Sequence, residues 1–385
     1  MLNFSFENQT RIHFGEGQIT TISNEIPKDA KVLVTYGGGS IKSNGVYDQV
    51  RDALKDHQWF EFSGIEPNPK YDTLMKAQAL IIDHKIDYLL AVGGGSVIDG
   101  TKFIAAAALF AGDDPWDIVA KQQKVERALP IGAVLTLPAT GSETNIGSVV
   151  TRDGHKLPFM SPAVRPQFAV LDPAVTLSLS DRQISNGVVD AFIHTMEQYL
   201  TYDVNAKVQD RFAEGLLQTL IEEGPKALQA ESKENLDVRA NIMWSATMAL
   251  NGLIGAGVPQ DWSTHMIGHE LTGSYGIDHA RTLSIVLPAV MKVCQEAKHD
   301  KLLQYAQRVW HVSEGSEVQQ IAQAIELTEA FFQRMVMPTR LADVKLGESD
   351  IDALISQLEL HGMVALGEKQ QITLEVSRQI LTAAL

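Results

Sequence analysis

Strand-like and helix-like hydrophobic patterns alternate through the first 170 residues. Residues 71–84 carry apolar side chains at helical spacing, and residues 98–110 form a second long helical run. Short apolar or β-branched runs predict strands at residues 31–36, 87–92, 131–137 and 168–171. Strands that alternate with helices indicate a largely parallel sheet with helices on both faces.

The pattern changes after residue 173. From about residue 181 onward no convincing strand is present, and helix-period segments are separated by Gly and Pro breaks. The sequence therefore predicts two domains: an α/β domain over residues 1–178 and an all-helical domain over residues 179–385.

Composition narrows the possible partners. The chain has 385 residues, 45% of them hydrophobic, and a formal net charge of −15, which argues against nucleic acid or an anionic membrane as a partner. It has one cysteine, Cys294, which has no neighbouring base and is expected to be an ordinary helix residue. We expect a cytoplasmic protein, because a chain with one cysteine has no internal disulfide and fits a reducing compartment. The start of the sequence also lacks signal-peptide character, and no apolar run approaches the ~20 residues of a membrane span.

Two Gly-Gly-Gly-Ser segments follow predicted strands. Residues 93–96 lie between a strong strand and a strong helix, so their backbone could hold a pyrophosphate, and a tight turn needed only for packing is equally compatible. Residues 37–40 lack the acidic residue that often holds the ribose of NAD, and Ser40 and Lys42 offer donors for a 2′-phosphate. The sequence thus favours NADP over NAD if a dinucleotide binds. Neither segment has the G-x-G-x-x-G pattern of an ordinary Rossmann site.

A third turn, TLPATGSE, is rich in hydroxyl groups. It follows the strand predicted at residues 131–137, and ligands of α/β sheets bind beyond the carboxyl ends of strands. Thr136, Thr140 and Ser142 are therefore candidates to meet a cofactor, although hydroxyl groups that cap a turn are equally compatible with this pattern.

Histidines and one aspartate in the helical half suggest a metal site. Asp190 and His194 are four residues apart in an apolar segment, and His265 and His279 flank a glycine-containing loop. Together they offer three nitrogens and one oxygen, which suits Zn²⁺ or Fe²⁺. Each histidine taken singly is more often a satisfied core or surface residue than a ligand. His269, one helical turn after His265, could be a ligand, a structural residue or a proton carrier. The other seven histidines are expected at the surface.

Several segments together resemble the iron-containing (group III) alcohol dehydrogenase family. They are GGGSVIDGTK, the TLPATGSE turn, DAFIHTMEQY and DWSTHMIGHELTGSYGIDHA, and the resemblance extends over the whole chain. The GGGS segment at residues 37–40 and the PQDWSTHMIGHEL segment resemble the bacterial NADPH-dependent aldehyde reductase branch of that family. The resemblance implies a dehydroquinate synthase-like fold with a cleft between the two domains.

The resemblance also implies roles for individual residues. The metal ligands would be Asp190, His194, His265 and His279, with His269 near the nicotinamide. Gly38 stands where NAD-preferring relatives carry an Asp. The cofactor would be held by Gly37, Gly38, Gly39, Ser40, Gly93, Gly94, Gly95, Ser96, Thr136, Thr140 and Lys156. The cleft would be faced by Asp99. Ser142 and Asn145 lie on the turn expected to face the substrate, and from that position we expect them to orient the substrate oxygen.

These features predict an NADP(H)-dependent oxidoreductase that acts on small aldehydes or primary alcohols with one divalent ion, zinc preferred over iron. A homodimer is implied by the resemblance alone. One rival is a dehydroquinate synthase-like lyase, which should show several Lys and Arg around the metal motifs; none occurs within residues 186–200 or 255–279. Two further rivals are a polyol dehydrogenase on the same fold and a non-catalytic nucleotide- or metal-binding protein. The apolar neighbours Phe192, Trp262, Met266 and Leu271 favour an uncharged substrate.

Overall fold

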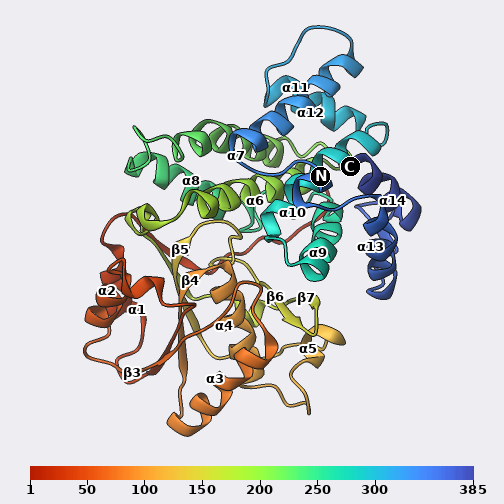
Figure 1. Ribbon diagram of the computed structural model, residues 1–385. Coiled ribbons are helices and arrows are strands. Elements are labelled where there is room, and N and C mark those ends of the chain that lie inside the picture. The colour runs from red at the N-terminus through yellow and green to blue at the C-terminus, as the bar shows by residue number, and fades with distance from the viewer. The chain divides into compact units, whose positions relative to one another are not determined.

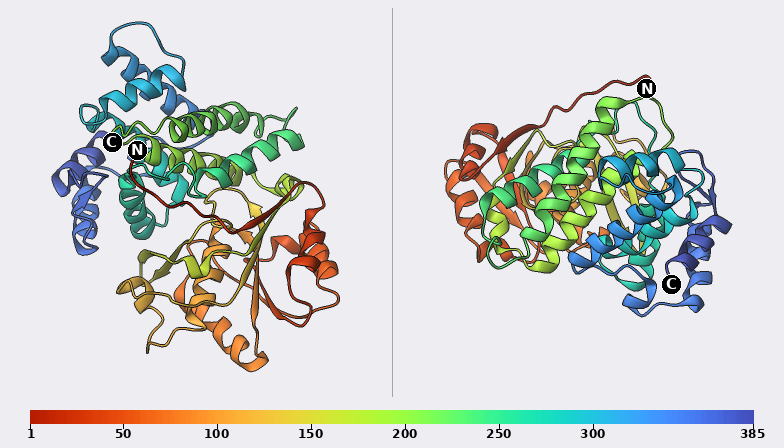
Figure 2. Two further views of the ribbon diagram at one scale, coloured as in Figure 1. Left: turned by 180° about the vertical axis from the view of Figure 1, so that it is seen from behind. Right: turned by 90° about the horizontal axis from the view of Figure 1, so that it is seen from above.

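A computed structural model describes all residues, 1–385, and divides them into two compact units. One unit comprises residues 7–179, and the other comprises residues 1–6 and 180–385. The sequence placed the first six residues with the α/β half. They instead run beside the helices of the second unit (Figure 2), where the Leu2 amide donates a 2.9 Å hydrogen bond to the Gly257 carbonyl.

The α/β unit is built on a six-stranded, fully parallel sheet of strand order β1-β8-β5-β4-β2-β3. A separate antiparallel pair, β6 and β7, follows β5. The sequence anticipated β2, β4, β5 and β8 but not the more exposed strands. The strands are β1 (Arg11–Phe14), β2 (Lys31–Thr35), β3 (Gln58–Phe62), β4 (Tyr88–Gly94), β5 (Ile131–Leu137), β6 (Gly147–Arg152), β7 (His155–Met160) and β8 (Phe168–Leu171).

Helices cover both faces of this sheet, as Figure 1 shows for α1 and α2 on one side and α3 and α4 on the other. Alternate residues of a strand point to opposite faces, so Val32, Val34 and Leu90 pack with Val46 and Val50 of α2 in one core cluster. The helices of this unit are α1 (Ile22–Glu25), α2 (Val46–Ala53), α3 (Tyr71–His84), α4 (Gly95–Ala107) and α5 (Asp117–Ala120).

The three turns singled out in the sequence share one edge of the sheet. They follow β2, β4 and β5, which are neighbours in the order β5-β4-β2 and parallel to one another. The chain passes from β2 outward to β3 and then returns to the other side of β2 to form β4. Sheets of this kind bind ligands at such a switch point, beyond the carboxyl ends of the strands.

The second unit is helical. Its helices are α6 (Asp181–Tyr199), α7 (Lys207–Lys226), α8 (Leu236–Ala249), α9 (Ser263–Tyr275), α10 (His279–Val293), α11 (His299–Arg308), α12 (Glu317–Arg334), α13 (Glu348–Leu360) and α14 (Leu374–Ala383). The prediction of no strand was wrong in one detail, since β9 (Ala365–Leu366) pairs antiparallel with β10 (Ile372–Thr373). With two residues each, these strands are too short to show a sequence period.

Helix α6 is the most deeply buried helix of this unit. It begins with a capping box in which the Ser180 and Gln183 side chains bind each other's backbone amides. Every residue from 187 to 199 is buried, and α7, α8 and α10 pack around the helix. Polar side chains on such a helix have no access to water and must find partners within the protein.

The structure also tests the expectations for Cys294, for the seven remaining histidines and for membrane-spanning segments. Cys294 directly follows α10 and is buried, and burial raises the pKa of its thiol to about 11, which disfavours the reactive thiolate form. The surface placement of the seven remaining histidines was wrong for His57, which is buried with its Nε2 3.1 Å from the Ile26 carbonyl oxygen. No helix in the structure combines the length and the apolar character needed to cross a bilayer.

Candidate functional site

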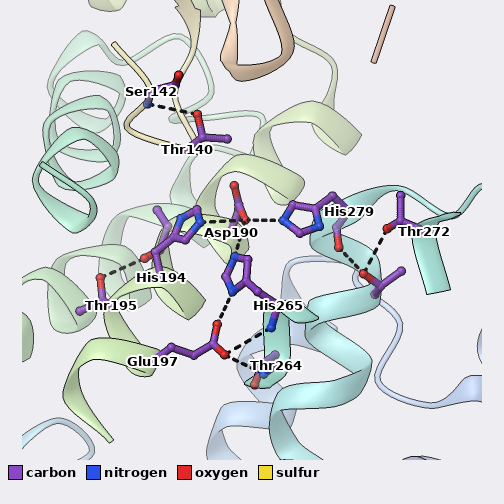
Figure 3. Close-up of polar contacts among 12 residues, drawn as sticks. Thr140, Ser142, Asp190, His194, Thr195, Glu197, Thr264, His265, Thr272 and His279 are labelled. Atoms are coloured by element: carbon purple, nitrogen blue, oxygen red, sulfur yellow. Dashed lines mark hydrogen bonds and ion pairs between the residues drawn. The ribbon is translucent and has the colours of Figure 1, made fainter. Parts of the chain in front are cut away.

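The Asp190 carboxylate lies at the centre of a group of imidazoles in the helical unit (Figure 3). Its Oδ1 atom is 3.8 Å from His194 Nε2, 3.9 Å from His265 Nε2 and 3.8 Å from His279 Nε2. Asp190 and His194 come from one face of α6, His265 from the first turn of α9, and His279 from the first residue of α10. Residues about ninety positions apart thus meet at one oxygen atom.

The donor atoms fit a divalent ion. Asp190 Oδ1 is buried and accepts no hydrogen bond, and separations of 3.8–3.9 Å are too long for hydrogen bonds. Two ligands about 2.1 Å from a tetrahedral ion lie roughly 3.4 Å apart, which is close to these separations. Asp190, His265 and His279 also meet the geometric requirement for a shared ion as a group of three. A buried carboxylate surrounded by imidazole nitrogens is the arrangement that a metal ion stabilises.

The distances between ring centroids show how the four histidines of this region lie relative to one another. The His194 and His265 rings are stacked with centroids 4.6 Å apart, and the His279 ring lies 5.2 Å from that of His265. The His269 ring lies 5.0 Å from His279 and 6.2 Å from His265. His269 is buried beside the predicted ligands, and, like His194, it is outside the group of three, Asp190, His265 and His279, that could share one ion.

Polar contacts fix the start of α10, which carries His279. The Asp278 carboxylate accepts a 2.7 Å bond from Arg182 Nε and a 2.9 Å bond from Asn186 Nδ2, both on α6. These bonds hold the N-terminus of α10 against the helix that supplies Asp190. The Arg182 guanidinium lowers the pKa of the Asp278 carboxyl, although burial opposes this shift.

One residue in contact with the cluster was not among the candidates predicted from the sequence. Glu197, on α6, contacts His265 Nδ1 with one carboxylate oxygen (Figure 3) and accepts the backbone amide of Thr264 with the other at 2.7 Å. Burial raises the pKa of the Glu197 carboxyl well above its ordinary value, and the neighbouring Asp261 raises it further. Its spacing was an available signal, because Glu197 is three residues after His194 and seven after Asp190, on the same helical face.

The apolar neighbours predicted for this site do not all face it. Phe192 packs against Phe331 and Phe332, with ring centroids 5.2 Å and 5.6 Å away, and Leu271 is in the core formed with α10 and α13. Trp262 does lie against the cluster, 5.3 Å from the His265 ring. Proximity in sequence misled here because helical residues two apart point in different directions.

In the α/β unit, the glycine-rich turn at residues 93–96 is closely packed. A Cβ atom on Gly93 would lie 2.5 Å from Val97, and one on Gly95 would lie 2.5 Å from Thr140. Both glycines are therefore needed for packing, and this turn opens α4, whose amides point beyond the sheet edge. Close packing and pyrophosphate binding are thus both compatible with the structure of this turn.

The turn at residues 37–40 is less closely packed at Gly38 than the turn at residues 93–96 is at its glycines. A Cβ atom on Gly38 would have no neighbour within 4 Å, so packing does not explain the missing side chain. Gly39 has a φ of +95°, which favours glycine. The Lys42 ammonium, suggested as a phosphate donor, binds Glu61 at 3.1 Å and lies over the Tyr47 ring. Gly38 therefore leaves open space beside the end of β2.

The TLPATGSE turn is supported by a buried polar network around Asp99 and Lys102 of α4. Ser142 Oγ donates to Asp99 Oδ1 at 2.5 Å and accepts from Lys102 Nζ at 2.8 Å. Lys102 also donates to Asn145 Oδ1 at 2.9 Å and to the Gly147 carbonyl at 2.7 Å. Burial raises the pKa of Asp99 and lowers that of Lys102 to about 8. Sequence reasoning missed Lys102 itself, three residues after Asp99.

The remaining predicted cofactor residues lie around these turns. Thr140 Oγ1 accepts the Ser142 amide at 3.2 Å, and Ser96 Oγ accepts the Asn68 amide at 3.3 Å. Thr136 is at the end of β5, and Lys156 is on β7 opposite Thr151. The structure thus brings the three predicted turns to one edge of the parallel sheet, leaves Lys156 on the separate β6–β7 pair, and brings the predicted metal residues together within the helical unit.

Comparison with known proteins places the whole chain in one family. The model of the iron-containing alcohol dehydrogenases matches residues 9–173, and that of the C-terminal part of the Fe-containing alcohol dehydrogenase family matches residues 184–385. The chain belongs to the iron-containing alcohol dehydrogenase family, as its motifs predicted, and it is an oxidoreductase of the alcohol dehydrogenase type.

Individual relatives are similar over their full length. The NADPH-dependent aldehyde reductase YqhD of Escherichia coli (strain K12) is 58% identical, with all of both chains covered. A crystal structure of E. coli K-12 YqhD superposes with a TM-score of 0.98 at 57% identity, covering 100% of this chain and 99% of that one. NADH-dependent butanol dehydrogenase A from Thermotoga maritima has a TM-score of 0.95 at 36% identity, with coverage of 100% and 99%. The predicted fold class, an α/β nucleotide-binding domain followed by a helical domain, is confirmed.

Proposed function

We propose that this protein is an NADPH-dependent aldehyde reductase that transfers hydride between NADPH and small aldehydes, and in reverse from primary alcohols. The observation that carries this proposal is the convergence of three imidazole nitrogens on the buried Asp190 oxygen. The full-length identity of 58% to an NADPH-dependent aldehyde reductase supports the same activity.

Asp190, His194, His265 and His279 would hold one divalent ion. When bound, the ion supplies Lewis-acid polarisation of a carbonyl group and the nicotinamide supplies the hydride. Three nitrogens and one carboxylate suit both Fe²⁺ and Zn²⁺. The family's description favours iron. The preference for zinc rests on the resemblance of the sequence to the aldehyde reductase branch alone, so metal analysis must decide between the two ions.

His269 is the proposed proton carrier. Its ring is buried and lies 5.0 Å from that of His279, outside the set of residues that would hold the ion. A histidine can both donate and accept a proton near neutral pH. In this proposal its imidazole delivers a proton, directly or through water, to the oxygen of the reduced substrate.

The nucleotide would bind at the carboxyl edge of the sheet. The amides of Gly93, Gly94, Gly95 and Ser96 would hold the pyrophosphate at the start of α4. The open space beside Gly38 would admit the 2′-phosphate of NADP. Thr136, Thr140 and Lys156 would complete the cofactor site, as would Gly37, Gly39 and Ser40.

For Asp99, Ser142 and Asn145 we propose a positioning role in place of direct substrate contact. Each of their side chains is hydrogen-bonded within the network around Lys102. The network joins α4 to the turn that carries Thr140, so it would keep that hydroxyl group in place for the cofactor.

The proposed partners are a small uncharged substrate and a second copy of the chain. Trp262 supplies the apolar surface beside the histidines, which favours an uncharged aldehyde. The homodimer rests on the family resemblance, and a cytoplasmic location rests on the presence of a single cysteine.

The function is tested by metal analysis of the purified protein combined with rates of NADPH and NADH oxidation over a graded series of aldehydes. We expect about one divalent ion per chain, turnover of several short aldehydes, and faster oxidation of NADPH than of NADH. Tight NADPH binding with no turnover of any aldehyde would contradict the proposal and favour a non-catalytic binding protein.

A further inference from the structure

Glu197 lies behind the metal cluster and contacts it through one residue. It comes from the same helix as Asp190 and His194, is almost fully buried, and has its carboxylate directed at the first turn of α9. One oxygen, Oε2, contacts His265 Nδ1. The other, Oε1, accepts hydrogen bonds from the backbone amides of Thr264 at 2.7 Å and His265 at 3.3 Å.

Two buried carboxylates accept the free amides in the first turn of α9: Asp261 Oδ1 accepts the Ser263 amide at 2.8 Å, and Glu197 Oε1 accepts the next two. The residue at the N-cap position is Trp262, with a left-handed φ of +62° and no side-chain hydrogen bond to the helix. Residues such as Ser or Asp normally accept the free amides at this point. Glu197, which is on α6, accepts the Thr264 and His265 amides of α9. One side chain thus fixes both the backbone and the ring of His265.

The contact at Nδ1 also determines which nitrogen of His265 is available to a metal. A neutral imidazole carries one proton, and the nitrogen that donates to a carboxylate is the one that carries it. With Nδ1–H donating to an ionised Glu197, the lone pair would be on Nε2, the atom that lies 3.9 Å from Asp190 Oδ1. The opposite tautomer would place a proton where the ion must bind.

Glu197 itself is held in place by a second buried charge cluster. The Asp261 amide donates to the Glu197 carbonyl at 2.9 Å, and the Asp261 carboxylate pairs with Lys298 Nζ at 2.5 Å. Lys298 also binds Glu368 at 3.0 Å and the Leu200 carbonyl at 2.7 Å. Lys298 thus neutralises the acidic groups behind Glu197 and ties the loop before α9 to the end of α6.

We propose that Glu197 is a positioning residue that fixes the tautomer and orientation of His265 and thereby sets the affinity of the cluster for a divalent ion. This inference rests on the proposed function, in which His265 is a metal ligand. Carboxylates that orient ligating histidines in this way typically change metal affinity 10–100-fold when they are replaced.

The test is Glu197→Gln in the full-length protein stripped of metal. Glutamine keeps the shape, and its carbonyl can still accept the Thr264 amide, but its NH₂ group faces His265 Nδ1 and favours the wrong tautomer. We expect Zn²⁺ affinity, measured by competition with a chelator, to fall about 10–100-fold. The metal-free variant should unfold at a temperature close to that of the metal-free wild type. Unchanged Zn²⁺ affinity in a folded variant would overturn the inference.

Glu270→Gln is the matched control. Glu270 is also a buried carboxylate on α9 bonded to a histidine, with Oε1 2.7 Å from His361 Nδ1, but His361 is not among the residues that could share the ion. Zn²⁺ affinity should stay within about twofold of wild type in this variant. An equal loss in both variants would mean that disturbance of α9, and not the orientation of His265, is responsible.

A double-mutant cycle separates orientation from helix capping. In a His265→Ala background, Glu197→Gln should lower Zn²⁺ affinity by less than about twofold, because the ring that it orients is gone. A further tenfold loss in that background would overturn the inference, since capping alone would then explain the effect.

One measurement needs no Glu197 variant to fold. Nitrogen-15 resonances of the histidine rings, with His265 assigned by its loss in His265→Ala, should show Nδ1 protonated in the metal-free wild type. A proton on Nε2 would overturn the inference. Failure of the proposed function has a different signature, because the wild type itself would then bind no Zn²⁺ at this cluster.

Discussion

Two buried polar clusters, one in each unit, illustrate opposite solutions to the same physical problem. Around Asp190, a carboxylate is surrounded by imidazoles at 3.8–3.9 Å, and its Oδ1 atom accepts no hydrogen bond. Around Asp99, a carboxylate is bridged by Ser142 to the Lys102 ammonium at hydrogen-bonding distances of 2.5 and 2.8 Å. Both carboxylates are removed from water, which is costly without compensation.

The difference lies in where the compensating positive charge comes from. The Asp99 cluster contains its own cation, so its side chains are occupied by one another and serve to hold a turn. The Asp190 cluster has no lysine or arginine among its side chains, so a bound cation would supply the compensating charge. A self-neutralised buried cluster therefore indicates support, and one that lacks a counter-charge indicates a ligand site.

The largest expected effect is on the Asp190 cluster. His265→Ala removes one of the proposed ligands, so aldehyde-dependent NADPH oxidation should fall about a thousand-fold or more, equivalent to about 4 kcal/mol of transition-state stabilisation. Steady-state rates and metal content measured on the same sample check this prediction. His299→Ala, in the same unit on α11, is the control and should retain both. Near-normal activity in a metal-depleted His265→Ala protein would rule out the metal role.

A comparable change in the Asp99 cluster should affect stability. Lys102→Met leaves Asp99 buried without its cation, which typically costs 3–5 kcal/mol, and we expect about that loss in the free energy of unfolding. Chemical denaturation measures it. Adding Asp99→Asn should restore part of the loss because the unpaired charge is removed. Lys124→Met is the control, since Lys124 is exposed and its pairing with Glu126 should contribute below about 1 kcal/mol.

Because the pKa of Lys102 is lowered by burial, we expect the free energy of unfolding to depend on pH. Burial lowers the pKa of Lys102 from 10.5 to about 8, so between these values the folded protein binds fewer protons than the unfolded chain. Stability rises with pH wherever the unfolded state binds more protons, so the contribution of this group to the free energy of unfolding should increase from pH 8 towards pH 10. The full span corresponds to about 3 kcal/mol at most.

Denaturation of the wild type and of Lys102→Met over this pH range isolates the contribution of the lysine. The difference in unfolding free energy between the two proteins should widen as the pH rises. A difference that stays constant from pH 7 to pH 10 would show that Lys102 keeps an ordinary pKa.

The smallest effect concerns cofactor choice. Gly38→Asp places a carboxylate in the open space beside β2, where it would repel the 2′-phosphate of NADPH and accept the ribose hydroxyls of NADH. The ratio of kcat/KM for NADPH over NADH should fall at least about tenfold, or about 1.4 kcal/mol. Gly38→Ala tests the effect of bulk without charge and should change the ratio little. An unchanged ratio in Gly38→Asp would place the 2′-phosphate elsewhere.

Much of the fold could be predicted from the pattern of apolar and polar residues along the chain alone. The buried strands at residues 88–94 and 131–137 were predictable because a strand covered on both faces is almost entirely apolar. The strands at residues 11–14 and 58–62 were not, because they form the edges of the sheet and their side chains are mostly exposed or half-buried. Asp190 and His194 were recognisable as candidate site residues too, because they are polar residues in an otherwise apolar helix.

The sequence by itself determined which residue types could carry the chemistry: three histidines and an aspartate for an ion, and glycine turns after parallel strands for a nucleotide. Only the tertiary structure decided which of them meet. Helix packing brings Asp190 to His265 and His279, buries Glu197 against His265, and joins Asp99 to Lys102 through Ser142. The physical reason is that periodicity reports the environment of a residue along its own element, whereas partners are chosen by the packing of elements distant in the chain.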